Sequence, residues 1–225
     1  MRTLIIPDVH EQMDLLEQKL EPTFHTYDHI VSLGDWFDTF KDHHQHRACR
    51  FIKKYIFDPK FTFLMGNHDA HYRWMNPQFQ CSGYNPTTQR IVNKELSQAE
   101  WQHFKISTQV GLFLLSHAGY HERTLKYREQ EAHAITAADA GGFHPIFGIG
   151  QARGGRSAFG GPLWLDWNYE FEPIESVPQI VGHTVQRGLP SRSGNSFCLD
   201  TALRDYAIIT EDGEDCTLDI QPTGK

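Results

Sequence analysis

The chain has 225 residues, of which 39% are hydrophobic and 22% are charged, a composition typical of a folded globular protein rather than a disordered one. Its 21 basic and 28 acidic residues give a net charge of −7, which argues against strong binding of nucleic acid by its surface. No apolar run reaches the ~20 residues that cross a bilayer, and the start shows no signal-peptide pattern, so we expect no association with a membrane. The four cysteines form no CxxC pair, which favours free thiols and a cytoplasmic location. This length favours a single domain over residues 1–225.

Three short apolar runs in the first third of the chain each end in a polar cluster. They cover residues 3–7, 29–33 and 61–65, and each is typical of a buried strand. Between them, residues 13–20 and 43–56 carry apolar side chains at helical spacing. The order strand, helix, strand, helix, strand predicts βαβ units, in which the carboxyl ends of parallel strands share one edge of the sheet. We therefore expect the three polar clusters to lie close together.

The pattern changes in the rest of the chain. Ser97, with Glu100 three residues later, has the capping-box spacing that opens a helix. A strand is predicted at 112–116, and further strands are predicted at 179–181, 197–199, 206–210 and 217–220. Eight of the 18 glycines lie between positions 141 and 161. We expect an irregular loop over about 141–163, of the kind that often serves as a binding loop or lid.

Five polar clusters follow predicted strands, and together they offer carboxylate, imidazole and amide ligands. In chain order they are Asp8-Val9-His10, Gly34-Asp35-Trp36-Phe37-Asp38, Gly66-Asn67-His68-Asp69, Ser116-His117-Ala118-Gly119 and Gly182-His183-Thr184. A single such cluster is weak evidence, because capped and buried histidines are common. Five in one chain predict a metal centre, and oxygen and nitrogen ligands without thiolate suit Mn, Fe or Zn. A carboxylate that bridges two ions is the natural way to hold a pair.

These clusters resemble the signature of the calcineurin-like metallophosphoesterase superfamily, which is DxH, GDxxD, GNHD or GNHE, a later His, and a GH near the end. The resemblance extends from Asp8 to His183 and is strongest to the phosphoprotein phosphatase branch, including bacterial and phage Ser/Thr phosphatases and diadenosine tetraphosphate hydrolases. The stretches that carry this closer likeness are SHAG at 116–119, GPLWLDW at 161–167, IVGHTVQ at 180–186 and SFCLDTA at 196–202. The resemblance implies an α/β fold, a single-domain β-sandwich of two mixed sheets flanked by helices.

The resemblance also implies a role for each matching residue. Asp8, His10 and Asp35 would hold one divalent ion, and Asp35, Asn67, His117 and His183 would hold a second, with Asp35 bridging. The two ions are expected to be Mn2+, with Fe, Zn or Ni as alternatives. A hydroxide held by the ions would attack the phosphate, and His68, steadied by Asp38, would protonate the leaving group.

Two positions depart from the family pattern. Phosphoprotein phosphatases follow GDxxD with an arginine that grips the substrate phosphate, whereas this chain has Thr39 there. Many other members of the superfamily end in GHxH, whereas position 185 is Val. The first departure predicts rearranged or weaker phosphate binding. The second favours the phosphatase branch and leaves the first ion with three protein ligands and water.

Other residues have weaker signals. Arg153 and Arg156 lie in the glycine-rich stretch ARGGR, and either could replace the missing arginine on a substrate phosphate. The alternative for both is a solvated loop arginine. We expect His43, His44 and His46 to be solvated at the start of a helix, and Trp164 and Trp167 to pack in the core.

The sequence therefore predicts a metal-dependent phosphatase whose partner is a phosphorylated substrate, either a protein or a nucleotide. A phosphodiesterase or dinucleotide polyphosphate hydrolase is the main alternative, because one bimetal site can serve both kinds of bond. A scaffold that has lost catalysis is a third reading, which the complete set of metal ligands and His68 disfavours. The oligomeric state is not predicted.

Overall fold

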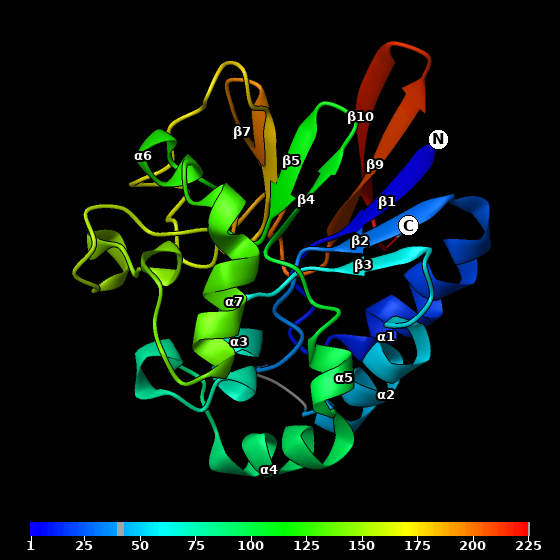
Figure 1. Ribbon diagram of the computed structural model, residues 1–225. Helices are drawn as coiled ribbons and strands as arrows, with labels where there is room; N and C mark the ends of the chain where they lie inside the picture. The colour runs from blue at the N-terminus through cyan, green and yellow to red at the C-terminus, as the bar shows by residue number, and fades with distance from the viewer. Residues whose placement is uncertain (40–42, 225) are drawn as a thin grey trace.

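The computed structural model describes residues 1–39 and 43–224, and its framework is a pair of five-stranded sheets (Figure 1). The first sheet has the order β10-β9-β1-β2-β3, and the second has the order β4-β5-β6-β8-β7. The strands of the first sheet are β1 (Arg2–Ile6), β2 (His29–Ser32), β3 (Phe61–Phe63), β9 (Asp205–Asp212) and β10 (Asp215–Pro222). The strands of the second are β4 (Ser107–Val110), β5 (Phe113–Ser116), β6 (Gln179–Val181), β7 (Ser191–Ser193) and β8 (Ser196–Cys198).

Both sheets are mixed, as expected. Strand β1 pairs in parallel with β2, which pairs in parallel with β3, while β9 and β10 run antiparallel on the other side of β1. In the second sheet β5, β6 and β8 are parallel, and β4 and β7 are antiparallel at the two edges. The expected parallel arrangement of the first three strands is therefore confirmed.

Alternating side chains of β1 and β2 explain how the layers pack. Ile5 and Val31 face the second sheet and join Leu115 and Ile180 in one buried cluster between the sheets. Leu4, Ile6 and Ile30 belong to a second buried cluster, which includes residues of the helices that cover the other face of the first sheet. Because strand side chains alternate in direction, one short apolar run contributes to both layers.

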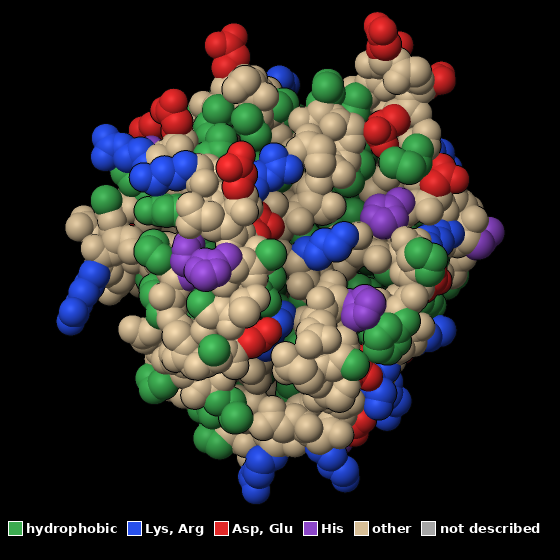
Figure 2. Space-filling model, viewed as in Figure 1, with side chains coloured by type: hydrophobic (Ala, Val, Ile, Leu, Met, Phe, Trp, Pro, Cys, Tyr) green, Lys and Arg blue, Asp and Glu red, His purple; other side chains and the backbone are tan. Residues whose placement is uncertain are grey.

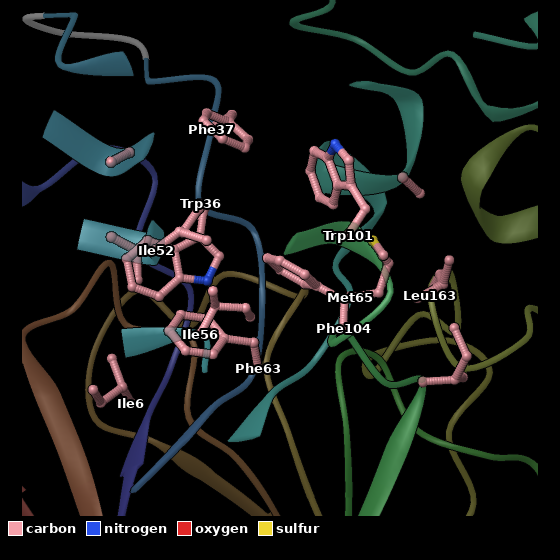
Figure 3. Packing of buried hydrophobic residues seen from close by; sticks show 14 of the residues in the cluster. Ile6, Trp36, Phe37, Ile52, Ile56, Phe63, Met65, Trp101, Phe104 and Leu163 are labelled. Carbon is pink, nitrogen blue, oxygen red and sulfur yellow. The ribbon is translucent and has the colours of Figure 1, made fainter. Parts of the chain in front are cut away.

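Seven α-helices lie among the described residues. They are α1 (Met13–Leu15), α2 (Gln45–Tyr55), α3 (Asn67–Arg73), α4 (Pro86–Glu95), α5 (Gln98–Trp101), α6 (Glu122–Leu125) and α7 (Glu131–Asp139). Helix α2 buries Ala48, Phe51 and Ile52 on one face, which is the amphipathic pattern that the sequence predicts. Figure 3 shows Ile52 and Ile56 beside Trp36, from the loop after β2, and Phe63, from the first sheet.

Some elements differ from their sequence-based prediction. Residues 13–20 form one short α-helical turn and then a π-helix, Leu16–Leu20. The capping box of Ser97 and Glu100 is present, but helix α5 is only four residues long. The glycine-rich region holds two 3-10 turns, Pro145–Phe147 and Gln151–Arg153. Trp164 and Trp167 are buried, as expected.

The surface is charged and varied. Figure 2 shows acidic and basic side chains interspersed over the face that it presents. His43 and His46 are exposed, as expected, and His46 pairs with Glu95 at 3.2 Å, whereas His44 is half-buried and its backbone N–H donates to Glu11. The four cysteines are free thiols. None of the helices within residues 1–39 and 43–224 has the length and apolar character needed to cross a membrane.

Candidate metal centre and active site

The five polar clusters meet because each follows the carboxyl end of a strand. Asp8 follows β1, Asp35 follows β2 and Asn67 opens α3 after β3. From the second sheet, His117 follows β5 and His183 follows β6. These strands are parallel within each sheet, so their carboxyl ends bring the side chains to one place where the two sheets adjoin.

One group of donor atoms comes from three of these loops. The Oδ1 atom of Asn67 lies 2.9 Å from Nε2 of His117 and 2.8 Å from Nδ1 of His183. The two histidine nitrogens are 3.1 Å apart. The Oδ2 atom of Asp35 completes the group at 3.4 Å from Nε2 of His117. The structure thus brings together the four residues predicted to hold one ion.

The surroundings of this group keep both histidine rings neutral and turn a lone pair of His117 toward Asn67. Nδ1 of His117 lies 3.0 Å from the carbonyl of Leu33, so the ring proton sits there and Nε2 presents a lone pair to Asn67. Burial lowers the pKa of His117 to about 3 and also lowers that of His183, which keeps both rings neutral. Neutral imidazoles, an amide oxygen and a carboxylate that converge at a buried place fit a bound cation.

A second group shares Asp35. Suitable atoms of Asp8, His10 and Asp35 all lie within 4.8 Å of one another. Nδ1 of His10 lies 3.0 Å from the carbonyl of Phe37, and Nε2 lies 3.5 Å from Oδ2 of Asp35. The same Asp35 oxygen therefore faces both groups, which is the arrangement that a bridging carboxylate requires.

The electrostatics of the site also fit a cation. Burial, and then the charge of nearby Asp200, raises the pKa of Asp8 well above its ordinary value. Burial, and then the charges of Asp8 and Asp69, does the same for Asp35. Buried carboxylates that repel one another lack a positive partner, and divalent ions would supply one.

Several site residues, in the loops after β1, β2 and β6, have an unusual backbone conformation. The φ angles of His10, Asp35, Asp38 and His183 are 42°, 52°, 67° and 66°, in the left-handed region that non-glycine residues seldom adopt. Asp69 accepts hydrogen bonds from the backbone N–H groups of Asp35 and Trp36, both at 2.8 Å. Trp36 points into the core beside Phe63 (Figure 3). Such strain persists only where the surroundings fix it, and it concentrates at functional sites.

The backbone at Gly182 lies very close to the carboxylate of Asp8. A Cβ atom at this position would lie 1.8 Å from Oδ1 of Asp8. The neighbouring N–H of His183 donates to Oδ2 of the same carboxylate at 2.9 Å. Asp8 can therefore occupy this position only because residue 182 has no side chain.

Gly182→Ala is accordingly expected to displace Asp8 and destabilise the fold. Overpacking of this kind costs about 1–3 kcal/mol, and each kcal/mol lowers Tm by about 2–4 °C in a chain of this size. Gly188→Ala is the matched control, because nothing lies within 4 Å of a Cβ there. Thermal unfolding and metal affinity of both variants test the expectation, and equal behaviour would show that Asp8 can move without cost.

A buried network surrounds His68. Its Nδ1 lies 2.8 Å from Oδ2 of Asp38, and its backbone N–H donates to Oδ1 of Asp35 at 2.9 Å. Asp38 also contacts Nε2 of His71 at 2.7 Å and accepts a hydrogen bond from the hydroxyl of Tyr72. Burial acts to raise the pKa of Asp38, but the hydrogen bonds from His68, His71 and Tyr72 outweigh it and hold the pKa below its ordinary value. Asp38 is thus an ionised anchor for His68.

A cavity of about 430 Å3 opens onto these residues, with His10, Asp35, Asn67, His68 and His183 in its wall. Arg153 also lines it, held by Asp166, whose Oδ2 is 2.7 Å from Nε, and by the hydroxyl of Thr184 at 2.9 Å from Nη2. Arg156 is exposed and is not among the described residues that line this cavity. Thr39 lines a different cavity, together with Glu11 and His44.

Several residues near the site were not predicted from the sequence. Asp166 and Asp200 lie in the stretches GPLWLDW and SFCLDTA, which carry part of the family resemblance, so a signal for them was present. Asp200 is buried beside Asp8, and its Oδ2 makes no hydrogen bond within the described part of the chain. His71, Tyr72 and Cys81 had no comparable signal, because only the fold brings them to Asp38 and His68.

Comparison with known proteins agrees with this geometry. A family model described as calcineurin-like phosphoesterase matches residues 1–187. No curated protein sequence matches the chain at a significant level.

Solved structures share the fold at low sequence identity. A cold-active protein-tyrosine phosphatase from a psychrophilic Shewanella species has a TM-score of 0.67 and 15% identity, covering 97% of this chain and 80% of that one. A protein serine/threonine phosphatase from Saccharomyces cerevisiae, described as similar to human PP5, has a TM-score of 0.53 and 10% identity, covering 98% and 79%. A putative diadenosine tetraphosphatase has a TM-score of 0.51 and 14% identity, covering 97% and 93%.

Proposed function

Because this chain belongs to the calcineurin-like phosphoesterase family and is a hydrolase of phosphoric esters, we propose that it is a metal-dependent phosphatase that acts on phosphomonoesters. The observation that carries the proposal is the convergence of donor atoms of Asn67, His117 and His183 beside the carboxylate of Asp35. The proposed substrates are phosphoproteins or nucleotides. The cavity is open to solvent, and His68, Asp35 and Arg153 line it. Such a cavity suits a phosphate group that is attached to a larger molecule.

Two divalent ions are the proposed cofactors, with Mn2+ first and Fe, Zn or Ni as alternatives. Asp8, His10 and Asp35 would hold one ion. The other would be held by Asp35 together with Asn67, His117 and His183. When bound, such a pair supplies Lewis acidity, which activates water as a nucleophile and neutralises charge on the phosphate.

His68 is the proposed general acid. Its Nδ1 is engaged by Asp38, so Nε2 is the atom left to hold a proton for the departing alcohol. Burial lowers the pKa of His68, and ionised Asp38 opposes this shift and fixes the orientation of the ring. His68 also lines the cavity, where it can reach a bound ester.

Arg153 is the proposed replacement for the phosphate-gripping arginine that Thr39 does not provide. The contacts of its guanidinium with Asp166 and Thr184 hold the group at the wall of the cavity. A guanidinium has five N–H donors, so these two contacts leave others for phosphate oxygens. Arg156 is an equal candidate by sequence, but it is the weaker one because it is not among the described residues that line the cavity.

Arg153→Ala should raise KM for a phosphomonoester about 10- to 100-fold, the range expected for lost hydrogen bonds to a charged group. Arg156→Ala, three residues along the same loop, is the matched control and should behave as wild type. Bound metal should stay unchanged in both variants, and the effect on a diester, which carries one charge fewer, should be smaller. Unchanged KM and kcat in the double variant would show that the phosphate is held without either arginine.

A substrate panel tests the proposed function. The protein is stripped with a chelator and reloaded separately with Mn, Ni, Zn or Mg, and each form is assayed on an aryl phosphomonoester, a bis-aryl phosphodiester and a dinucleotide tetraphosphate. We expect the monoester to have the highest kcat/KM. Faster hydrolysis of the diester or the dinucleotide would favour the phosphodiesterase or dinucleotide polyphosphate hydrolase reading. No hydrolysis of any substrate with any metal would favour an inactive scaffold.

A further inference from the structure

A second set of possible ligands lies directly beside the proposed acid. The Sγ atom of Cys81 is 3.2 Å from Nδ1 of His71 and 3.8 Å from Nδ1 of His68. All three residues offer a ligand atom within 4.8 Å of the others. This cluster of His68, His71 and Cys81 shares no residue with the two groups that surround Asp35.

The spacing of the cluster matches a small tetrahedral ion. Zinc binds sulfur at about 2.3 Å and imidazole nitrogen at about 2.0–2.1 Å, so tetrahedral angles place the two ligand atoms about 3.5 Å apart. The two measured sulfur–nitrogen distances, 3.2 and 3.8 Å, lie on either side of this value.

Asp38 provides the outer support that such a site requires. Its Oδ2 atom lies 2.7 Å from Nε2 of His71, and Nδ1 of the same ring is the nitrogen that faces Cys81. A carboxylate behind a histidine is the usual way in which proteins orient a zinc-binding imidazole. His71 is fully buried, so its ring is fixed.

The cluster is also open to ions from solvent, and its ligands differ chemically from the two groups that surround Asp35. Cys81 and His68 both line the cavity that opens onto the site, so a free ion can approach, and water can fill a fourth position. Thiolate is a soft ligand that selects zinc over manganese or magnesium. The groups around Asp35 contain no sulfur among the residues assigned to them.

The geometry points to a third metal site at His68, His71 and Cys81, which takes a thiophilic divalent ion such as Zn2+ and inhibits hydrolysis. An ion on Nδ1 of His68 replaces the contact of that nitrogen with Asp38, which orients the ring for proton donation. The inhibitory effect rests on the proposed acid role of His68, whereas the binding of the ion does not. Zinc would therefore slow an enzyme whose two principal ions are still in place.

The test starts with the Mn-loaded enzyme, to which Co2+ and Zn2+ are added separately. Co2+ bound through Cys81 should produce a thiolate-to-cobalt charge-transfer band. Zn2+ should lower turnover of an alkyl phosphomonoester while metal analysis shows that Mn is retained. Cys81→Ser should remove the band and weaken zinc inhibition, relative to its own uninhibited rate, at least about 10-fold. Cys216→Ser, whose thiol is on β10, is the matched control and should keep both effects.

Four results would overturn the inference. A cobalt band that persists in Cys81→Ser would place the thiolate ligand elsewhere. Equal zinc inhibition of wild type and Cys81→Ser, or inhibition that follows loss of Mn, would assign the effect to the main centre. A Cys81-dependent band without any change in hydrolysis would overturn the inhibitory role of the site. If the Mn-loaded enzyme hydrolyses no ester, the proposed function fails, and the cobalt band still decides whether the site exists.

Discussion

Asp35→Asn is expected to abolish hydrolysis and to lower the amount of bound metal. The Oδ2 atom of Asp35 lies 3.5 Å from Nε2 of His10 and 3.4 Å from Nε2 of His117, so one oxygen serves both groups of ligands. Asparagine keeps the shape of the side chain but removes its charge, which both ions would need. The loss of activity should exceed the ~10–100-fold cost of changing an outer partner of a metal ligand.

The folding of this variant can be checked independently of its activity. Removal of the Asp35 charge relieves repulsion with buried Asp8 and Asp69, so the metal-free variant should unfold at or above the temperature of the metal-free wild type. Asp58→Asn, at an exposed position, is the control for the chemical change. An Asp35→Asn protein that binds two ions per chain and turns over normally would rule out the bridging role.

His68→Ala should keep both proposed ions and lose about 10²–10⁴-fold in kcat, the contribution typical of general acid catalysis. The loss should depend on the leaving group. A nitrophenolate departs with little need of a proton, whereas an alkyl alcohol cannot leave as an alkoxide at neutral pH. The variant should therefore be impaired much more strongly on the alkyl ester.

The comparison of leaving groups separates an acid from a purely structural residue. If His68 only supported the fold of the site, both esters would lose rate equally and bound metal would also fall. His46→Ala is a suitable control, because His46 is an exposed histidine on α2 that pairs with Glu95. Equal losses on the two esters in the His68 variant would remove this residue from the acid role.

The buried strands and the faces of helices were predictable from the sequence, because apolar spacing reports burial. Met13, Leu16 and Leu20 are all buried, as their spacing indicates. The same spacing serves an α-helix or a π-helix, so it could not reveal the hydrogen-bond pattern of the segment Leu16–Leu20. The spacing of apolar residues predicts which side chains are buried, but it does not predict the type of helix.

The missed elements carry little apolar signal. Strands β4 and β7 lie at the edges of the second sheet, and β7 has the sequence Ser-Arg-Ser, which has no apolar residue to mark it. Helix α7 buries only Ala134 and Ala138, whose small side chains give a weak pattern. Backbone pairing and tertiary packing, which the sequence does not display, define these elements.

The convergence of the candidate ligands was predictable for a different reason. Parallel strands have their carboxyl ends at one edge of the sheet. The motifs that follow β1, β2 and β3 were therefore expected to lie together. The choice between Arg153 and Arg156 was not predictable, because both lie in one glycine-rich stretch. Contacts of Arg153 with Asp166 and Thr184, distant in sequence, distinguish the two.

Titration of the metal-free protein with Mn2+ tests whether hydrolysis depends on two bound ions. Hydrolysis of an aryl phosphomonoester is measured after each addition, together with the amount of ion bound. We expect no activity in the metal-free protein, and activity that rises with added ion and reaches its plateau at two equivalents per chain. Full activity without added metal, or a plateau at one equivalent, would contradict this expectation.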